Sequence, residues 1–167
     1  MNANAFRHFY GYHFTENRKI WDGYVTGLSH EQFTQHVDYS RGSVQDQILH
    51  LISCDDVWFS GLRGVEPRED LNPADFTDRE SIRVHWDKVE QTMRDYLAEL
   101  RDDMLFDKPI KEPEEDKDLI LWQVLLHVVN HGTDHRAQLL RLLNDLGVKT
   151  TSQDYIFYVY DNLQSAA

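Results

Sequence analysis

Apolar residues recur every three or four positions in four stretches of this chain, and this spacing places them on one face of an α-helix. In the clearest stretch, charged residues separate Ile82, Trp86, Val89 and Met93. The fourth stretch is apolar almost all round, which is typical of the most buried helix in a helical domain. We predict helices over about residues 4–26, 43–62, 79–103 and 119–146.

Residues at the ends of the second and fourth stretches support these boundaries. The hydroxyl of Ser43 can cap the free backbone amides at a helix start, and Asp46 follows three residues later. Gly64 and Gly147 come after the last apolar positions, and glycine readily adopts the left-handed conformation that ends helices. These signals predict one helix that begins after Ser43 and ends before Gly64, and a second helix that ends before Gly147.

Two long polar segments, residues 63–78 and 104–118, contain all four prolines of the chain. About 16 extended residues span ~50 Å, which is more than the ~30 Å length of a 20-residue helix. The first segment can therefore return along the molecule and place the second and third helices parallel. We predict an all-α fold in one domain, residues 1–167: a four-helix bundle with this long crossover. The aromatic tail segment DYIFYVYDN is expected to form either a last helical turn or an extended strip over the bundle.

Histidine provides the candidate chemistry, because three of the nine histidines stand four residues apart at positions 127, 131 and 135. Residues four apart share a helix face, and two imidazoles one turn apart can bind one metal ion. A third ligand must come from another helix, and His50 is the best candidate because it flanks the apolar stripe of the second helix. Gly132 stands where the HExxH motif has its glutamate, so the zinc-peptidase motif is excluded. Asp134 resembles the acidic residue of the inverted H-x-x-E-H order.

The chain resembles the DinB family of metal-dependent proteins in the segments QILHLISCDDVWFSGL, LLHVVNHGTDHRAQLLRLLNDLG and DYIFYVYD. The most specific element is NHGTDHRAQ, residues 130–138. The resemblance implies a four-helix bundle with a crossover after the second helix, and a homodimer. It also implies that the metal ligands are His50, His131 and His135. His127 then lies outside the ligand set and lines the cavity or bonds a group beside the ligands.

Four further residues near the motif have expected roles. Gln138 and Asp134 are candidates to orient an imidazole through its second nitrogen. Arg136 projects away from the ligand face, so we expect a salt bridge or a dimer contact there. Cys54 follows His50 by one turn and could reach the ion, although a lone cysteine is more often a small buried apolar residue.

Three neutral imidazoles leave a divalent ion with an open coordination position, which is typical of catalytic or ligand-binding sites. Zinc, nickel, iron and cobalt all suit imidazole ligands. The resemblance favours a thiol-dependent S-transferase or isomerase that uses a low-molecular-weight thiol and a small-molecule substrate. The alternatives are a small metal-dependent hydrolase with Asp134 as the catalytic base, or a non-catalytic metal-binding bundle with a stress-related role. Near the motif we find no cluster of Arg or Lys that would hold carboxylates of the thiol.

Composition narrows the list of partners. The 167 residues include 29 acidic and 17 basic side chains, a net charge of −12, which disfavours nucleic acids and anionic membrane surfaces. The single cysteine excludes an intrachain disulfide framework and a multi-cysteine zinc site.

No apolar run approaches a membrane span, and the N-terminus does not resemble a secretion signal. We expect a cytoplasmic protein, and aromatic residues on the tail and first helix, expected to be exposed, suggest a homodimer.

Overall fold

The computed structural model describes residues 1–66 and 71–165, and these residues form helices and loops without any strand. The α-helices are α1 (Ala3–Gly23), α2 (His30–Thr34), α3 (Val44–Arg63), α4 (Arg79–Ala98), α5 (Leu121–Asp145) and α6 (Tyr155–Ser165). Short 3-10 helices lie at Val25–Gly27, Pro73–Asp75 and Asp102–Phe106. The all-α prediction is confirmed, and six α-helices within the described residues replace the four expected.

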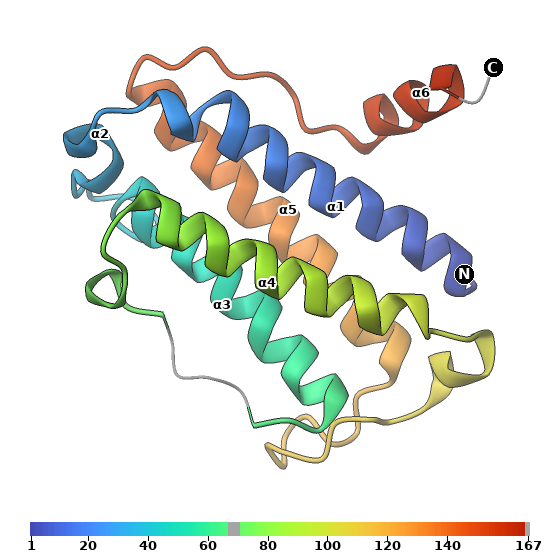
Figure 1. Ribbon diagram of the computed structural model, residues 1–167. Helices are drawn as coiled ribbons and strands as arrows, with labels where there is room; N and C mark the ends of the chain where they lie inside the picture. Colours follow the sequence, from blue (N-terminus) through green and yellow to red (C-terminus); the bar gives the residue numbers. More distant parts are fainter. Residues whose placement is uncertain (67–70, 166–167) are drawn as a thin grey trace.

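The four long helices lie side by side around a common core (Figure 1). α3 packs against α4 and α5, and α1 packs against the same two helices on the other side. Figure 1 shows α3 and α4 running in the same direction, with α1 and α5 running the opposite way. This is the orientation that the long polar segment between α3 and α4 predicts.

The caps of α3 and the end of α5 agree with the predicted signals. The Ser43 hydroxyl accepts a hydrogen bond of 3.0 Å from the backbone amide of Asp46. Gly64 ends α3 with φ 64°, and Gly147 follows α5 with φ 82°. The start of α3, on which the placement of His50 depends, is therefore fixed by local chemistry.

The first and third predicted helices extend well past the observed helix ends. α1 ends at Gly23 and α4 at Ala98, although the apolar pattern continues beyond both ends. Val25 and Leu28 beyond α1, and Leu100 beyond α4, are buried without being α-helical. The spacing of apolar residues indicates which residues are buried and does not by itself show where an α-helix ends. A short 3-10 turn can keep the chain buried beyond the end of an α-helix.

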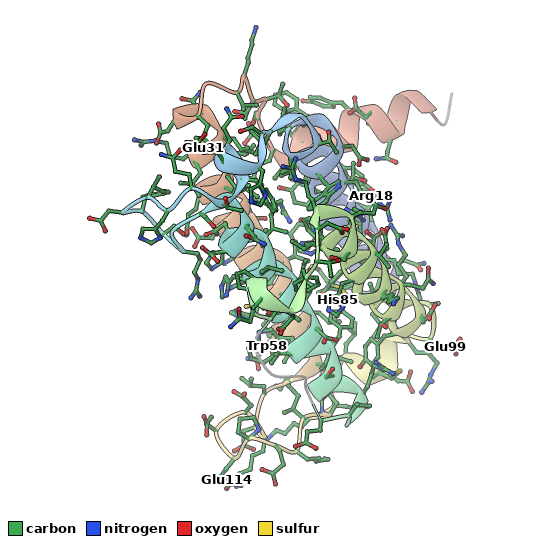
Figure 2. All side chains as sticks on the ribbon, turned by 60° about the vertical axis from the view of Figure 1, so that its left-hand side comes forward. Arg18, Glu31, Trp58, His85, Glu99 and Glu114 are labelled. Atoms are coloured by element: carbon green, nitrogen blue, oxygen red, sulfur yellow. The ribbon has the colours of Figure 1, made fainter. Side chains whose placement is uncertain are left out.

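Most charged side chains lie on the outside of the bundle, as the labelled Glu99 and Glu114 illustrate (Figure 2). Arg18 pairs there with Asp87 at 3.0 Å and with the largely buried Glu90 at 3.3 Å. Among the described residues, no helix is long and apolar enough to cross a membrane.

The aromatic tail forms helix α6, which packs on α1 through two tyrosines. The ring of Tyr155 lies 5.4 Å from that of Phe9, and the ring of Tyr158 lies 5.2 Å from that of His8. Four other apolar side chains of α6 are exposed: Ile156, Phe157, Tyr160 and Leu163. The expectation of exposed aromatic residues therefore holds for the tail, but it is wrong for α1, where these rings are buried: Phe6, Tyr10, Tyr12, Phe14 and Trp21.

A buried polar network between α5 and α1 contains Arg136, which is fully inaccessible to solvent. Its guanidinium donates to Asn17 Oδ1 at 2.9 Å, Thr133 Oγ1 at 3.0 Å and Gln153 Oε1 at 3.0 Å, and it lies 3.0 Å from His13 Nδ1. Burial lowers the pKa of Arg136. The expected salt bridge or dimer contact is therefore wrong, because the side of α5 that carries Arg136 meets α1 instead of solvent.

The network also reaches α3, because the Nε2 atom of His13 lies 3.1 Å from Asp55 Oδ2. Both side chains are buried, and a buried polar group is stable only when it is hydrogen-bonded. The network thus ties α1, α3 and α5 together directly behind the histidine-bearing face of α5.

Gly132 allows this close packing, because a Cβ atom there would lie 2.5 Å from Cε1 of His13. We expect Gly132→Ala to destabilise the protein by about 1–2 kcal/mol, since overpacking outweighs the gain of about 1 kcal/mol in helix propensity. Urea denaturation followed by circular dichroism measures the change.

Gly61→Ala is the matched control on α3, because its Cβ would lie at an ordinary 3.7 Å from Ile110. That variant is expected to be unchanged or slightly more stable. A Gly132→Ala protein as stable as Gly61→Ala would contradict the packing described here.

Candidate metal centre

Three imidazoles converge at the contact between α3 and α5. His50 comes from α3, His131 and His135 come from α5, and each offers one ring nitrogen within 4.8 Å of the other two. The Nε2 atoms of His50 and His135 are 3.2 Å apart. The ring centroids of His131 and His135 are 4.3 Å apart, and those of His50 and His131 are 5.3 Å apart. All three rings are half-buried.

The spacing of these nitrogens fits one ion. Two nitrogens bound at about 2.1 Å to the same tetrahedral ion stand ~3–4 Å apart, and the His50–His135 pair lies in this range. The ring nitrogen of His131 lies within 4.8 Å of the other two. These residues fit a divalent metal ion, and the structure brings together the three histidines predicted as a set.

Burial makes the three imidazoles poor bases. It lowers the pKa of His50 and of His131 to about 4, and it also lowers the pKa of His135. Arg41 and the neighbouring rings lower the pKa of His50 further. All three rings are therefore neutral near pH 7, which is the form that binds metal ions.

Gln47 orients one of the rings. Its buried side-chain amide donates to the backbone carbonyl of His135 at 3.1 Å and lies 2.7 Å from Nδ1 of the same residue. The ring is thereby held with Nε2 facing His50. The sequence interpretation gave this role to Gln138 or Asp134, but Gln138 donates to Asp134 Oδ2 at 3.0 Å instead. Gln47 precedes His50 by three residues, a same-face spacing that could have identified it.

Two more groups approach His50. Arg41, from the segment between α2 and α3, donates from Nη2 to His50 Nε2 at 2.8 Å. The Sγ atom of Cys54 lies 3.6 Å from the same nitrogen but does not belong to the cluster of converging ligand atoms. Sequence reasoning found no cluster of Arg or Lys near the motif and did not identify Arg41, because Arg41 reaches the site from a loop outside the predicted helices.

His127 and Asp134 border the site. They line an open hollow of about 510 Å³ on α5 together with His131 and Asn130. The ring of His127 lies 4.9 Å from that of Trp58 and 5.7 Å from that of His131. His127 is thus a lining residue beside the cluster, and Asp134 is an exposed carboxylate at its edge.

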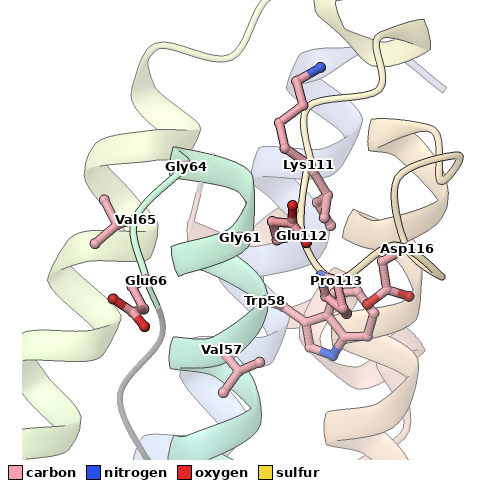
Figure 3. A pocket seen from close by; sticks show the side chains of 11 residues that line it. Val57, Trp58, Gly61, Gly64, Val65, Glu66, Lys111, Glu112, Pro113 and Asp116 are labelled. Carbon is pink, nitrogen blue, oxygen red and sulfur yellow. The ribbon is translucent and has the colours of Figure 1, made fainter.

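Trp58 also lines a mostly apolar cavity of about 450 Å³ near the end of α3 (Figure 3). Trp58 follows His50 by two turns of α3, about 12 Å along the helix axis. The volume suits a small organic molecule. The apolar side chains that line it are Val57, Trp58, Val65, Ile110 and Pro113, with Lys111, Glu112 and Asp116 among the polar ones.

We expect the metal-free protein to lose unfolding free energy as the pH falls from about 6.5 toward 4. The unfolded chain binds protons on its histidines near pH 6.5, whereas the pKa of folded His50 and His131 is about 4. The unfolded state therefore binds more protons in this window, so stability declines with falling pH. Urea denaturation in the presence of a chelator measures the slope.

The double variant His50→Gln, His131→Gln is the control, and its stability should depend less steeply on pH over the same window. An equal slope for the variant and the wild type would contradict the assignment of low pKa values to these two rings.

Comparison with known proteins gives the family of this chain. The chain is 23% identical over 167 residues to a protein named DinB from Bacillus subtilis (strain 168), and the alignment covers 96% of each protein. The family model described as the DinB family matches residues 1–165, which include both helices of the histidine cluster. The chain therefore belongs to the DinB family.

Proposed function

We propose that this protein holds one divalent metal ion through His50, His131 and His135 and acts with it as a thiol-dependent S-transferase or isomerase on a small molecule. The observation that carries the proposal is the convergence of three neutral imidazoles from two helices. We also propose that the four long helices are the four-helix bundle of the family, with α2 and α6 added to it.

The donor set supports a catalytic or ligand-binding ion over a structural one. Structural zinc sites are normally closed by four protein ligands, whereas the cluster within the described residues offers three. Imidazole suits zinc, nickel, iron and cobalt, so any of these ions fits the proposal. When bound, the ion would supply Lewis acidity that favours the thiolate form of a thiol near neutral pH.

The chain's own groups have separate tasks in this proposal. The imidazoles of the cluster would bind the metal ion. Gln47 keeps Nε2 of His135 facing His50. The cavity beside Trp58 accommodates the apolar part of an electrophilic substrate. The thiol gives its proton to solvent, and its sulfur forms a bond to an electrophilic carbon of the substrate. The bond between that carbon and its leaving group breaks, and the leaving group departs with the electron pair. We place the protein in the cytoplasm, where low-molecular-weight thiols are kept reduced.

The His135→Ala variant is expected to lose most of its bound metal, with affinity weakened by at least about 100-fold, because two imidazoles hold an ion less well than three. Protein purified without a histidine tag is analysed by inductively coupled plasma mass spectrometry and by calorimetric titration with Zn²⁺. His127→Ala is the matched control on the same helix face, and its metal content should stay near that of the wild type. Equal metal content in the wild type and the His135→Ala variant would overturn the proposed site.

Hydrolysis is the second candidate function, because Asp134 lines the same open hollow as His131. As a catalytic base, Asp134 would take a proton from an attacking water molecule. The third possibility is a metal-binding protein without turnover and with a stress-related role.

Asp134→Asn separates these candidates. The variant should keep its metal, and if the protein is a hydrolase its turnover should fall by about 100-fold or more, whereas thiol conjugation should persist. Asp145→Asn, near the end of the same helix, is the control, because Asp145 pairs with Arg141 on the surface. Turnover of esters without any added thiol, lost in Asp134→Asn alone, would contradict the transferase.

We further propose that the protein forms a homodimer. The support is the exposed apolar face of α6, since Ile156, Phe157 and Leu163 are 46%, 50% and 65% exposed. A monomer mass near 20 kDa in light scattering at micromolar concentration would refute this, given a chain mass of 19.8 kDa.

A further inference from the structure

The guanidinium of Arg41 contacts one of the converging histidine nitrogens. Its Nη2 atom lies 2.8 Å from His50 Nε2, and that same nitrogen lies 3.2 Å from His135 Nε2. A positively charged group thus points at the nitrogen with which His50 would bind a positively charged ion. With the ion bound, Arg41 must release this nitrogen and still lie beside a second cation.

No carboxylate of the described residues forms an ion pair with Arg41. The chain carries 29 acidic and 17 basic residues, yet within residues 1–66 and 71–165 Arg41 makes no ion pair. The nearby Asp134 instead accepts a hydrogen bond from Gln138. The charge of Arg41 is therefore available to an external anion.

The backbone holds Arg41 in this place. Ser40 adopts a left-handed φ of 52°, which is uncommon for a residue other than glycine, and its hydroxyl donates to Gln47 Oε1 at 2.8 Å and also contacts Gln138 Oε1. Gly42 has a φ of 102°, and a Cβ atom there would lie 2.6 Å from Nδ1 of His36. Of these two residues only Ser40 is strained, because glycine adopts a positive φ without steric cost. The loop is tied to α3 through Gln47 and to α5 through Gln138.

We propose that Arg41 binds a carboxylate of the small-molecule ligand, next to the open position of the metal ion. This inference rests on the proposed metal site. A carboxylate between the guanidinium and the ion neutralises both cations, and the planar fork of arginine matches a carboxylate with two parallel hydrogen bonds. The carboxylate can belong to the thiol or to the second substrate, and both sources present the same chemistry to Arg41.

Binding to the cobalt-loaded protein tests this proposal. Mercaptoacetate, acetate and 2-mercaptoethanol are titrated separately and followed by the visible absorption of Co²⁺ and by calorimetry. In Arg41→Gln, mercaptoacetate and acetate should bind at least about 10-fold more weakly, and 2-mercaptoethanol should bind within about twofold of the wild type. Arg41→Lys should recover part of the loss, because it keeps the charge but not the fork. Arg141→Gln, an exposed arginine near the end of α5, should bind all three like the wild type.

The titrations with mercaptoacetate and with acetate distinguish a carboxylate on the thiol from a general carboxylate site. Weaker mercaptoacetate binding with unchanged acetate binding would assign the carboxylate to the thiol, whereas loss of both supports a general carboxylate site. Equal mercaptoacetate and acetate affinities in Arg41→Gln and the wild type would overturn the proposal, even if Arg41→Gln binds cobalt more tightly.

A separate arm distinguishes this failure from failure of the proposed function. If the wild type takes up no cobalt, the metal site itself is refuted. Acetate is then titrated into the metal-free protein by nuclear magnetic resonance. Identical acetate binding in the wild type and Arg41→Gln in that experiment would also overturn the role of Arg41. The unfolding midpoint in urea verifies that each variant is folded.

Discussion

The packing of α3 against α5 is the contact on which the histidine cluster depends, because each helix supplies only part of it. α5 places His131 and His135 one turn apart, but a pair of imidazoles on one helix does not define a metal site. α3 brings His50 to 3.2 Å from His135 and brings Gln47 to the other side of the same ring. Burial at this contact keeps the rings neutral, which is the form that binds a divalent metal ion.

α5 is also held in place by its packing against α1, which Gly132 and Arg136 face. Each of these residues follows a histidine of the cluster by one position, and one position is a turn of about 100° around the helix. The buried guanidinium bonds to Asn17, and Gly132 admits the ring of His13 against the helix backbone. The helix that carries two of the three imidazoles therefore cannot shift without breaking buried hydrogen bonds. Such rigid support is what a preorganised metal site requires.

The sequence predicted the features that follow from the helical spacing of residues and from the residues that begin and end helices. The four-residue steps among the histidines, the flank position of His50 and the cap at Ser43 are all properties of single helices. The angle count also placed Arg136 off the ligand face, but it could not tell whether that face meets solvent or α1. Arg41 could not be found this way, since its position depends on a loop that only the packed fold defines. The apolar period likewise continued past α1 and α4, because buried residues follow both helix ends.

X-ray absorption spectroscopy of the zinc- or cobalt-loaded protein tests the central claim most directly, because it reports the atoms bound to the ion. Three imidazole ligands predict nitrogen scatterers at about 2.0–2.1 Å with the multiple scattering typical of histidine, completed by oxygen from water. This spectrum should lose one imidazole contribution in His135→Ala if that variant is loaded at high metal concentration. A sulfur scatterer at about 2.3 Å would instead make Cys54 a ligand, and fewer than three imidazoles in the wild type would contradict the cluster as the metal site.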